Sequence, residues 1–182
     1  MKFFALYLLT AALSLANVST KITVNGSTFP ASIQNIPWIG ATNYGARGNP
    51  DLGMGVSYRG ESMKIDLYLY DSLNVDWSKL PLKERIKKEN ESILDIFKQL
   101  TESGDYTNVK IKLRETIKAG EWSFAHTELD FTDKNSGDLN SHYYLAELHG
   151  KILKIRISSQ AGADPAIAKA AFLEIAAALA AK

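Results

Sequence analysis

Apolar and polar residues alternate over residues 54–70, a pattern that predicts a β-hairpin. In its first strand the large residues stand at every other position, and Arg59-Gly60-Glu61-Ser62 then supplies residues suited to a turn. The second strand places apolar residues at Met63, Ile65, Leu67 and Leu69. Alternation with a period of two is typical of strands that bury one face and leave the other polar.

Similar alternation after residue 106 predicts four more strands, at residues 107–117, 121–131, 140–149 and 151–158. The connections between them are short, which favours antiparallel pairing. Before the hairpin, residues 20–34 predict a short, loose hairpin around Asn25-Gly26. Residues 37–53 are dense in glycine and proline and predict an irregular loop that carries Trp38 and Tyr44.

Two segments show the spacing of amphipathic helices. The first covers residues 80–103, with Asp76 or Ser78 as its N-cap and Gly104 as the residue that ends it. The second covers residues 166–181 and is rich in alanine, the strongest helix former. Asp164 and Pro165 precede it as an N-cap and a first helical residue.

This order of elements predicts an α+β fold rather than a parallel α/β fold. We expect an antiparallel sheet of about six strands, with the two long helices packed on it as a sandwich. The length suits one domain with a core of its own.

The first residues show the features of a secretory signal peptide. Lys2 is followed by an apolar stretch, and the small residues Ser14 and Ala16 are spaced as a signal peptidase requires. A transmembrane anchor needs about 20 apolar residues, more than this stretch contains. The chain has no cysteine that could carry a lipid or form a disulfide. We therefore predict a signal peptide at 1–16, cleavage near Ala16, and a domain at 17–182 without a membrane span, in the periplasm or secreted.

Charge balance argues against a nucleic-acid binder. The chain has 21 basic and 20 acidic residues, and the predicted signal peptide holds one of the basic residues, Lys2. Nucleic-acid-binding domains normally carry a basic excess. No partner of that class is therefore expected.

The order of elements resembles the PsbP-like fold, which includes small exported bacterial domains of the DcrB type. The resemblance rests on the hairpin from Gly53 to Tyr70, on the helix that ends Leu100-Thr101-Glu102-Ser103-Gly104-Asp105-Tyr106, on the strand from Val109 to Leu113, and on the closing Asp164-Pro165 helix. It covers about residues 50–181 and carries no functional motif. What it implies is a sandwich fold and a non-enzymatic accessory role.

No pattern in the sequence points to a catalytic group, a metal or another cofactor. The three histidines are His126, His142 and His149. A zinc site would require all three to converge beside a carboxylate such as Glu128 or Glu147. Isolated histidines on a half-exposed surface are the alternative. Acidic residues around Asp133 lack the spacing of a calcium loop and suit a turn. We predict no metal ligands.

Polar side chains share one face of three predicted strands. If these faces coincide, the sheet presents a surface rich in tyrosine and arginine, which partner-binding surfaces favour. An ordinary wet sheet face with cross-strand ion pairs is the alternative. The residues that we predict to bind are Tyr68, Tyr70, Lys110, Lys112, Arg114 and Arg156.

These observations predict an exported envelope protein that acts as a non-catalytic binding or accessory module. Its partner would be an envelope protein or a small ligand, met through the polar sheet face or the loop at Trp38–Tyr44. The alternative is a small hydrolase or metal-dependent enzyme whose site is assembled from dispersed residues.

Overall fold

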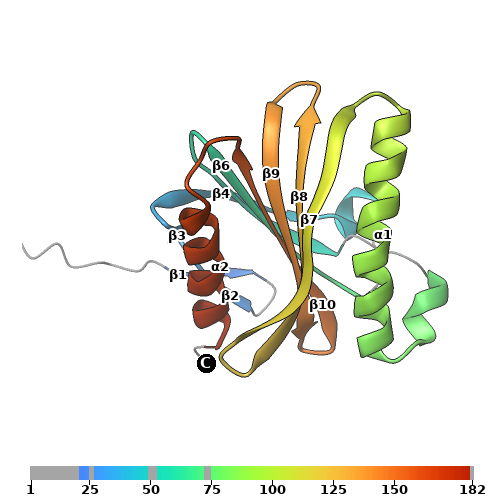
Figure 1. Ribbon diagram of the computed structural model, residues 1–182. Helices are drawn as coiled ribbons and strands as arrows, with labels where there is room; N and C mark the ends of the chain where they lie inside the picture. The colour runs from blue at the N-terminus through green and yellow to red at the C-terminus, as the bar shows by residue number, and fades with distance from the viewer. Residues whose placement is uncertain (1–20, 25–26, 49–52, 72–74, 181–182) are drawn as a thin grey trace, which may run out of the picture.

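The computed structural model describes residues 21–24, 27–48, 53–71 and 75–180 (Figure 1). The predicted signal peptide at 1–16 lies outside these ranges. Within them, no helix is both long and apolar enough to cross a membrane.

Most strands belong to one curled antiparallel sheet of eight strands. The strands in chain order are β3 (Ser32–Ile33), β4 (Ile36–Asn43), β5 (Met54–Arg59), β6 (Met63–Tyr70), β7 (Tyr106–Ala119), β8 (Trp122–Asp133), β9 (Gly137–Leu148) and β10 (Lys151–Gln160). Their order across the sheet is β3-β4-β5-β6-β10-β9-β8-β7. Two further strands, β1 (Lys21–Val24) and β2 (Ser27–Pro30), form a separate hairpin.

The α+β class is therefore confirmed, while the expected size of the sheet was too small. The two additional strands are β3, in the segment 20–34 where we expected a separate loose hairpin, and β4, which lies largely in residues 37–53, where we expected an irregular loop. Residues 36–43 form β4, which pairs with β5 through a register shift between Trp38 and Gly40. The glycine and proline of β4 are tolerated because β4 lies next to the edge of the sheet, where its outer side pairs with only the two residues of β3.

The hairpin predicted at 54–70 forms as β5 and β6, with Val56 opposite Leu67 and Tyr58 opposite Ile65. The predicted four-strand meander forms as β7 to β10. Its last strand, β10, pairs with β6. This pairing joins the N-terminal and C-terminal halves of the chain in the middle of the sheet.

The two helices are α1 (Leu82–Glu102) and α2 (Pro165–Ala180). As predicted, Asp164 caps α2 by accepting a hydrogen bond from the Ala166 amide at 2.9 Å. Gly104 follows α1 with φ of 78°, the left-handed conformation that ends many helices. The predicted N-cap of α1 is wrong: the cap position is Pro81, with no side-chain hydrogen bond, because residues 75–79 form a separate 3₁₀ turn.

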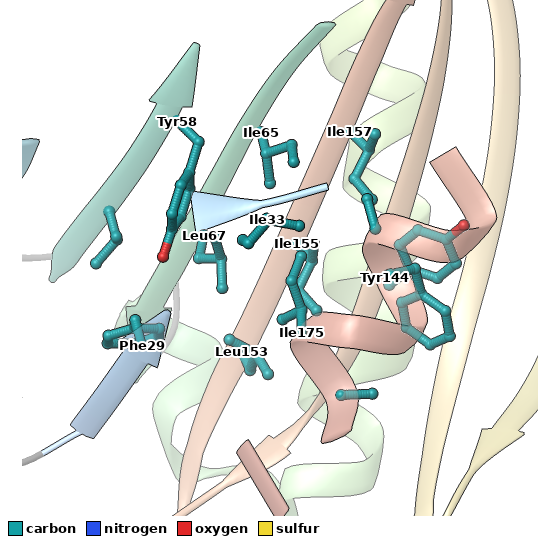
Figure 2. Packing of buried hydrophobic residues seen from close by; sticks show 14 of the residues in the cluster. Phe29, Ile33, Tyr58, Ile65, Leu67, Tyr144, Leu153, Ile155, Ile157 and Ile175 are labelled. Carbon is teal, nitrogen blue, oxygen red and sulfur yellow. The ribbon is translucent and has the colours of Figure 1, made fainter. Parts of the chain in front are cut away.

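The helices lie on opposite faces of the sheet, so the molecule has three layers (Figure 1). On one face α2 and the β1–β2 hairpin bury the larger apolar cluster, which includes Tyr58, Ile155 and Ile175 (Figure 2). On the other face α1 covers a smaller cluster around Phe97 and Leu145. We call these the α2 face and the α1 face. Strands in the middle of the sheet are therefore covered on both sides, and a polar residue there needs a partner.

Candidate functional site

Two tyrosines of β6 and two cations of β10 form a cluster on the α1 face: Tyr68, Tyr70, Lys154 and Arg156. We call it the tyrosine–cation patch. Tyr68 lies directly opposite Lys154 in the antiparallel register, so their side chains point to the same face. Lys154 Nζ lies 5.1 Å from the centre of the Tyr68 ring and 5.4 Å from that of Tyr70.

Arg156 is held by two further contacts. Its guanidinium carbon lies 5.5 Å from the centre of the Tyr143 ring on β9, and its Nε donates a hydrogen bond to Ser158 Oγ at 3.1 Å. Cations within about 6 Å of an aromatic ring are attracted by its negative face. The patch therefore presents two positive charges against three tyrosine rings.

Asp66, the cross-strand partner of Arg156 on β6, anchors one side of the patch. Its side chain is buried and accepts hydrogen bonds from Ser57 Oγ at 2.7 Å and from Arg59 at 3.0 Å. Lys64 Nζ lies 3.3 Å from its other oxygen. A buried carboxylate is tolerated only with such partners. The polar side chains of this face therefore form a hydrogen-bonded and ion-paired network and are not only hydrated by solvent.

The pKa values of these groups follow from their burial. Burial, assisted by the Asp66 carboxylate, raises the pKa of Tyr68 to about 12. Burial and the neighbouring Glu89 carboxylate raise the pKa of Tyr70 well above its ordinary value. Burial lowers the pKa of Lys154. At neutral pH both tyrosines are therefore neutral, and the Tyr68 hydroxyl is a donor rather than a phenolate.

Access to the patch is partial. Tyr70 is buried at 1% exposure, whereas Tyr68, Lys154 and Arg156 are half-buried. Helix α1 packs over β7 to β10 on this face, and its first half also reaches β6, where Glu89 lies beside Tyr70. The accessible side chains of the patch, Tyr68, Lys154 and Arg156, therefore lie on this face where the cover by α1 ends.

The six residues predicted to bind do not form one surface. Tyr68, Tyr70 and Arg156 come together in the patch, but the three cations of β7 do not. Lys110 and Lys112 belong to the α2 face: Lys110 lies opposite Asp130, and Lys112 Nζ lies 3.1 Å from Glu128 Oε1. Alternation in the sequence predicted one shared face for these cations, and this was wrong because β7 contains register shifts at residues 107–110 and 111–113.

Arg114 points to the α1 face but stands far from the patch. The register connects it through Thr127 and Tyr143 to Arg156, which is three strands away. Three strand spacings correspond to about 14 Å. Arg114 therefore cannot share a small ligand with Arg156.

A cavity of about 540 Å³ lies at the start of α2, lined by Lys110 and Lys112 among other residues. Its charges are paired internally: Lys112 also approaches Asp130 Oδ2 at 3.6 Å, and Asn140 donates to Glu128 and Asp130. Burial acts to raise the pKa of Glu128, but hydrogen bonds from Asn140 and Lys112 outweigh it and the pKa is lowered. The cavity therefore offers few unpaired charges to a ligand.

Two of the three histidines converge on the α2 face. His126 Nε2 lies 3.1 Å from His142 Nδ1, and His126 Nδ1 lies 3.2 Å from Glu115 Oε1. One arrangement of protons satisfies both contacts with neutral rings: His126 donates to Glu115, and His142 donates to His126. This leaves His142 Nε2 as a buried nitrogen without a hydrogen-bond partner among the described residues.

The histidine pair does not extend to a metal site. His149 occupies the turn after β9 with φ of 52°, seven residues from His142 and therefore roughly 23 Å along the chain. The described residues contain no group of three or more histidine, aspartate or glutamate side chains that could hold a metal ion. Asp133 has a structural role, because its Oδ1 accepts the amides of Asn135 and Ser136 at 2.8 Å.

One solved structure agrees with this architecture. The solution structure of CyanoP, the cyanobacterial PsbP from Synechocystis sp. PCC 6803, superposes with a TM-score of 0.54 at 12% identity, over 93% of this chain and 96% of that one. The fold is PsbP-like. A second structure, of a protein of unknown function and putative regulator, PA94 from Pseudomonas aeruginosa, has a TM-score of 0.40 at 12% identity, covering 83% of this chain and 89% of that one. No protein-family model and no curated protein sequence matches the chain.

Proposed function

We propose that this protein is an exported, non-catalytic binding or accessory module of the cell envelope, of the DcrB-like type within the PsbP-like fold. The observation that carries the proposal is the tyrosine–cation patch. In this patch Lys154 and Arg156 lie beside Tyr68, next to the part of the sheet that α1 covers.

The patch suits binding more than chemistry. Tyr68 and the two cations supply hydrogen-bond donors and positive charge in a partly desolvated place, where a carboxylate or another anionic group of a partner would be favoured. Asp66 is already engaged by Ser57 and Arg59. It therefore does not compete with an anionic group of an incoming partner for these donors.

Export is the second part of the proposal and rests on the pattern of residues 1–16. Expression of the full chain in a Gram-negative host, followed by N-terminal sequencing of the product in the periplasmic fraction, tests it. Cleavage near Ala16 is expected. A full-length product that stays in the cytoplasm would remove the envelope from the proposal.

The binding surface is tested with paired variants of residues 17–182, the mature chain under this proposal. Tyr68→Ala combined with Arg156→Gln should abolish capture of partners from envelope extract and stabilisation by ligands in a thermal-shift screen. Lys169→Gln, at an exposed position of α2, should leave both unchanged, as a matched loss of one positive charge. A Tyr68→Phe variant, which keeps the ring and removes the hydroxyl, controls for folding. Equal binding by all variants would show that the patch is not the site.

The second candidate function is a small hydrolase, and the Glu115–His126–His142 chain is the observation in its favour. Such a chain can orient and polarise an imidazole. Turnover of a panel of activated esters that disappears in His142→Ala, with unfolding still cooperative, would establish this function and displace the first. No turnover by the unmodified protein, with His142→Ala indistinguishable from it, is the outcome that the binding proposal requires.

A further inference from the structure

Strand β7 lies at one end of the sheet, and within the described ranges β8 is the only strand that pairs with it. From Lys110 to Thr116 every side chain is exposed, on both faces of the strand. Strands of globular proteins normally bury at least one face. Neither helix buries this segment, although Ile111 lines a cavity beside α1, and the segment stands apart from the tyrosine–cation patch.

The stretch Leu113–Ala119 is the regular part of this edge. The register shifts of β7 lie before it, and its residues pair without interruption with Glu128 to Trp122. No described residue forms a hydrogen bond with its outer backbone edge. Open edges of this kind accept an added strand unless charge or irregularity prevents it.

The side chains of this stretch specify the added strand. Arg114, Thr116 and Lys118 share one face, while Leu113 and Ile117 share the other. Neither Arg114 nor Lys118 has an ion pair among the described residues, whereas Glu115 is engaged by His126. Leu113 is 39% exposed. The edge thus carries two free positive charges on one side. On the other side lie the exposed Leu113 and the half-buried Ile117, which packs against the larger apolar cluster.

We propose that the outer edge of Leu113–Ala119 binds an extended segment of a partner protein as a ninth strand, with acidic residues opposite Arg114 and Lys118 and apolar residues opposite Leu113 and Ile117. Charge complementarity selects this occupant. A second copy in antiparallel register centred on Thr116 would place Arg114 opposite Lys118 of its mate, and like charges directly opposite are unfavourable.

A capped peptide, Thr-Glu-Val-Thr-Thr-Glu-Val, is the probe, because its glutamates fall opposite Lys118 and Arg114 in antiparallel register. Titrated into the isotope-labelled mature chain, it should cause saturable NMR shifts confined to β7 and should slow hydrogen exchange of amides in 113–119. The same peptide with lysines in place of glutamates should bind on the order of tenfold more weakly. Raised salt should reduce this difference, since exposed charges are screened.

Charge reversal provides the matched variants. In Arg114→Glu/Lys118→Glu the preference should invert, so that the lysine peptide binds and the glutamate peptide does not. Lys134→Glu/Lys169→Glu, a reversal of two exposed lysines elsewhere, should behave as the unmodified protein. Shifts outside β7, no saturable binding, or equal binding of both peptides would overturn the proposal. So would a concentration-dependent dimer that Arg114→Glu/Lys118→Glu abolishes. None of these outcomes depends on the tyrosine–cation patch.

Discussion

Phe172 fixes the position of α2, and truncating it should cost a large part of the stability of the fold. Its side chain is 2% exposed. The ring stacks on Tyr144 with centroids 4.0 Å apart and meets the edge of Phe124 at 5.0 Å. Phe172→Ala removes both contacts and leaves a cavity between the helix and the sheet.

The expected loss in the free energy of unfolding is about 4–5 kcal/mol. Phe→Ala in a core costs about 3–5 kcal/mol, and aromatic pairs add about 0.5–1.5 kcal/mol beyond burial, which favours the upper part of the range. For a chain of this size each kcal/mol corresponds to about 2–4 °C in Tm. The Tm should therefore fall by roughly 12–15 °C at the middle of that range.

Urea denaturation of the mature chain, followed by far-UV circular dichroism, measures this loss. Leu173→Ala is the matched control. Leu173 follows Phe172 on the same helix but is 47% exposed, so its truncation should lower the free energy of unfolding by less than about 1 kcal/mol. The m-value should stay unchanged if unfolding remains two-state. A loss below about 2 kcal/mol for Phe172→Ala, or equal losses for both variants, would refute the docking of α2 through this ring.

Three further predictions concern pH, backbone and charge. Burial lowers the pKa of folded His142 below the ordinary 6.5, so stability present above that pH should be lost as the pH falls below it. When the free energy of unfolding is measured by urea titration at several pH values, His142→Phe should lose less stability on acidification than the unmodified protein. An equal loss would show that His142 is not the source of the pH dependence. Gly53→Ala should cost several kcal/mol because a Cβ there would lie 2.1 Å from a β6 carbonyl oxygen, whereas Gly150→Ala meets nothing within 4 Å and should cost about 1–2 kcal/mol for its positive φ. Asp66→Asn should cost about 1–3 kcal/mol by weakening charge-assisted hydrogen bonds, against little for exposed Asp71→Asn, and equal losses on chemical denaturation would contradict its anchoring role.

The parts of the fold that could be predicted were those with local signals. Alternation located β5 and β6, and the Asp164-Pro165 pair located the start of α2. Strand β4 was missed because glycine and proline mark turns far more often than strands. The bulges of β7 were missed because nothing in the spacing of its lysines reveals an extra residue.

The histidine pair was within reach of sequence reasoning. A turn around Asp133 was predicted, and in an antiparallel hairpin the turn sets the register of both strands. That register places His126 opposite Tyr144 and His142 opposite Glu128, so the two imidazoles are diagonal neighbours. The missing step was to extend the register from the turn, not to find another motif.

The pairing of β10 with β6 has a consequence for synthesis. Ribosomes deliver β6 first, and its partner in the middle of the sheet is the last strand of the chain. Until β10 has been synthesised, β6 and β9, which flank it in the sheet, each have an unpaired edge. The larger apolar cluster also lacks α2 at this stage. Non-local pairing of this kind is slow to form. The nascent chain should therefore remain unfolded until nearly complete, which is the state that the proposed export would require.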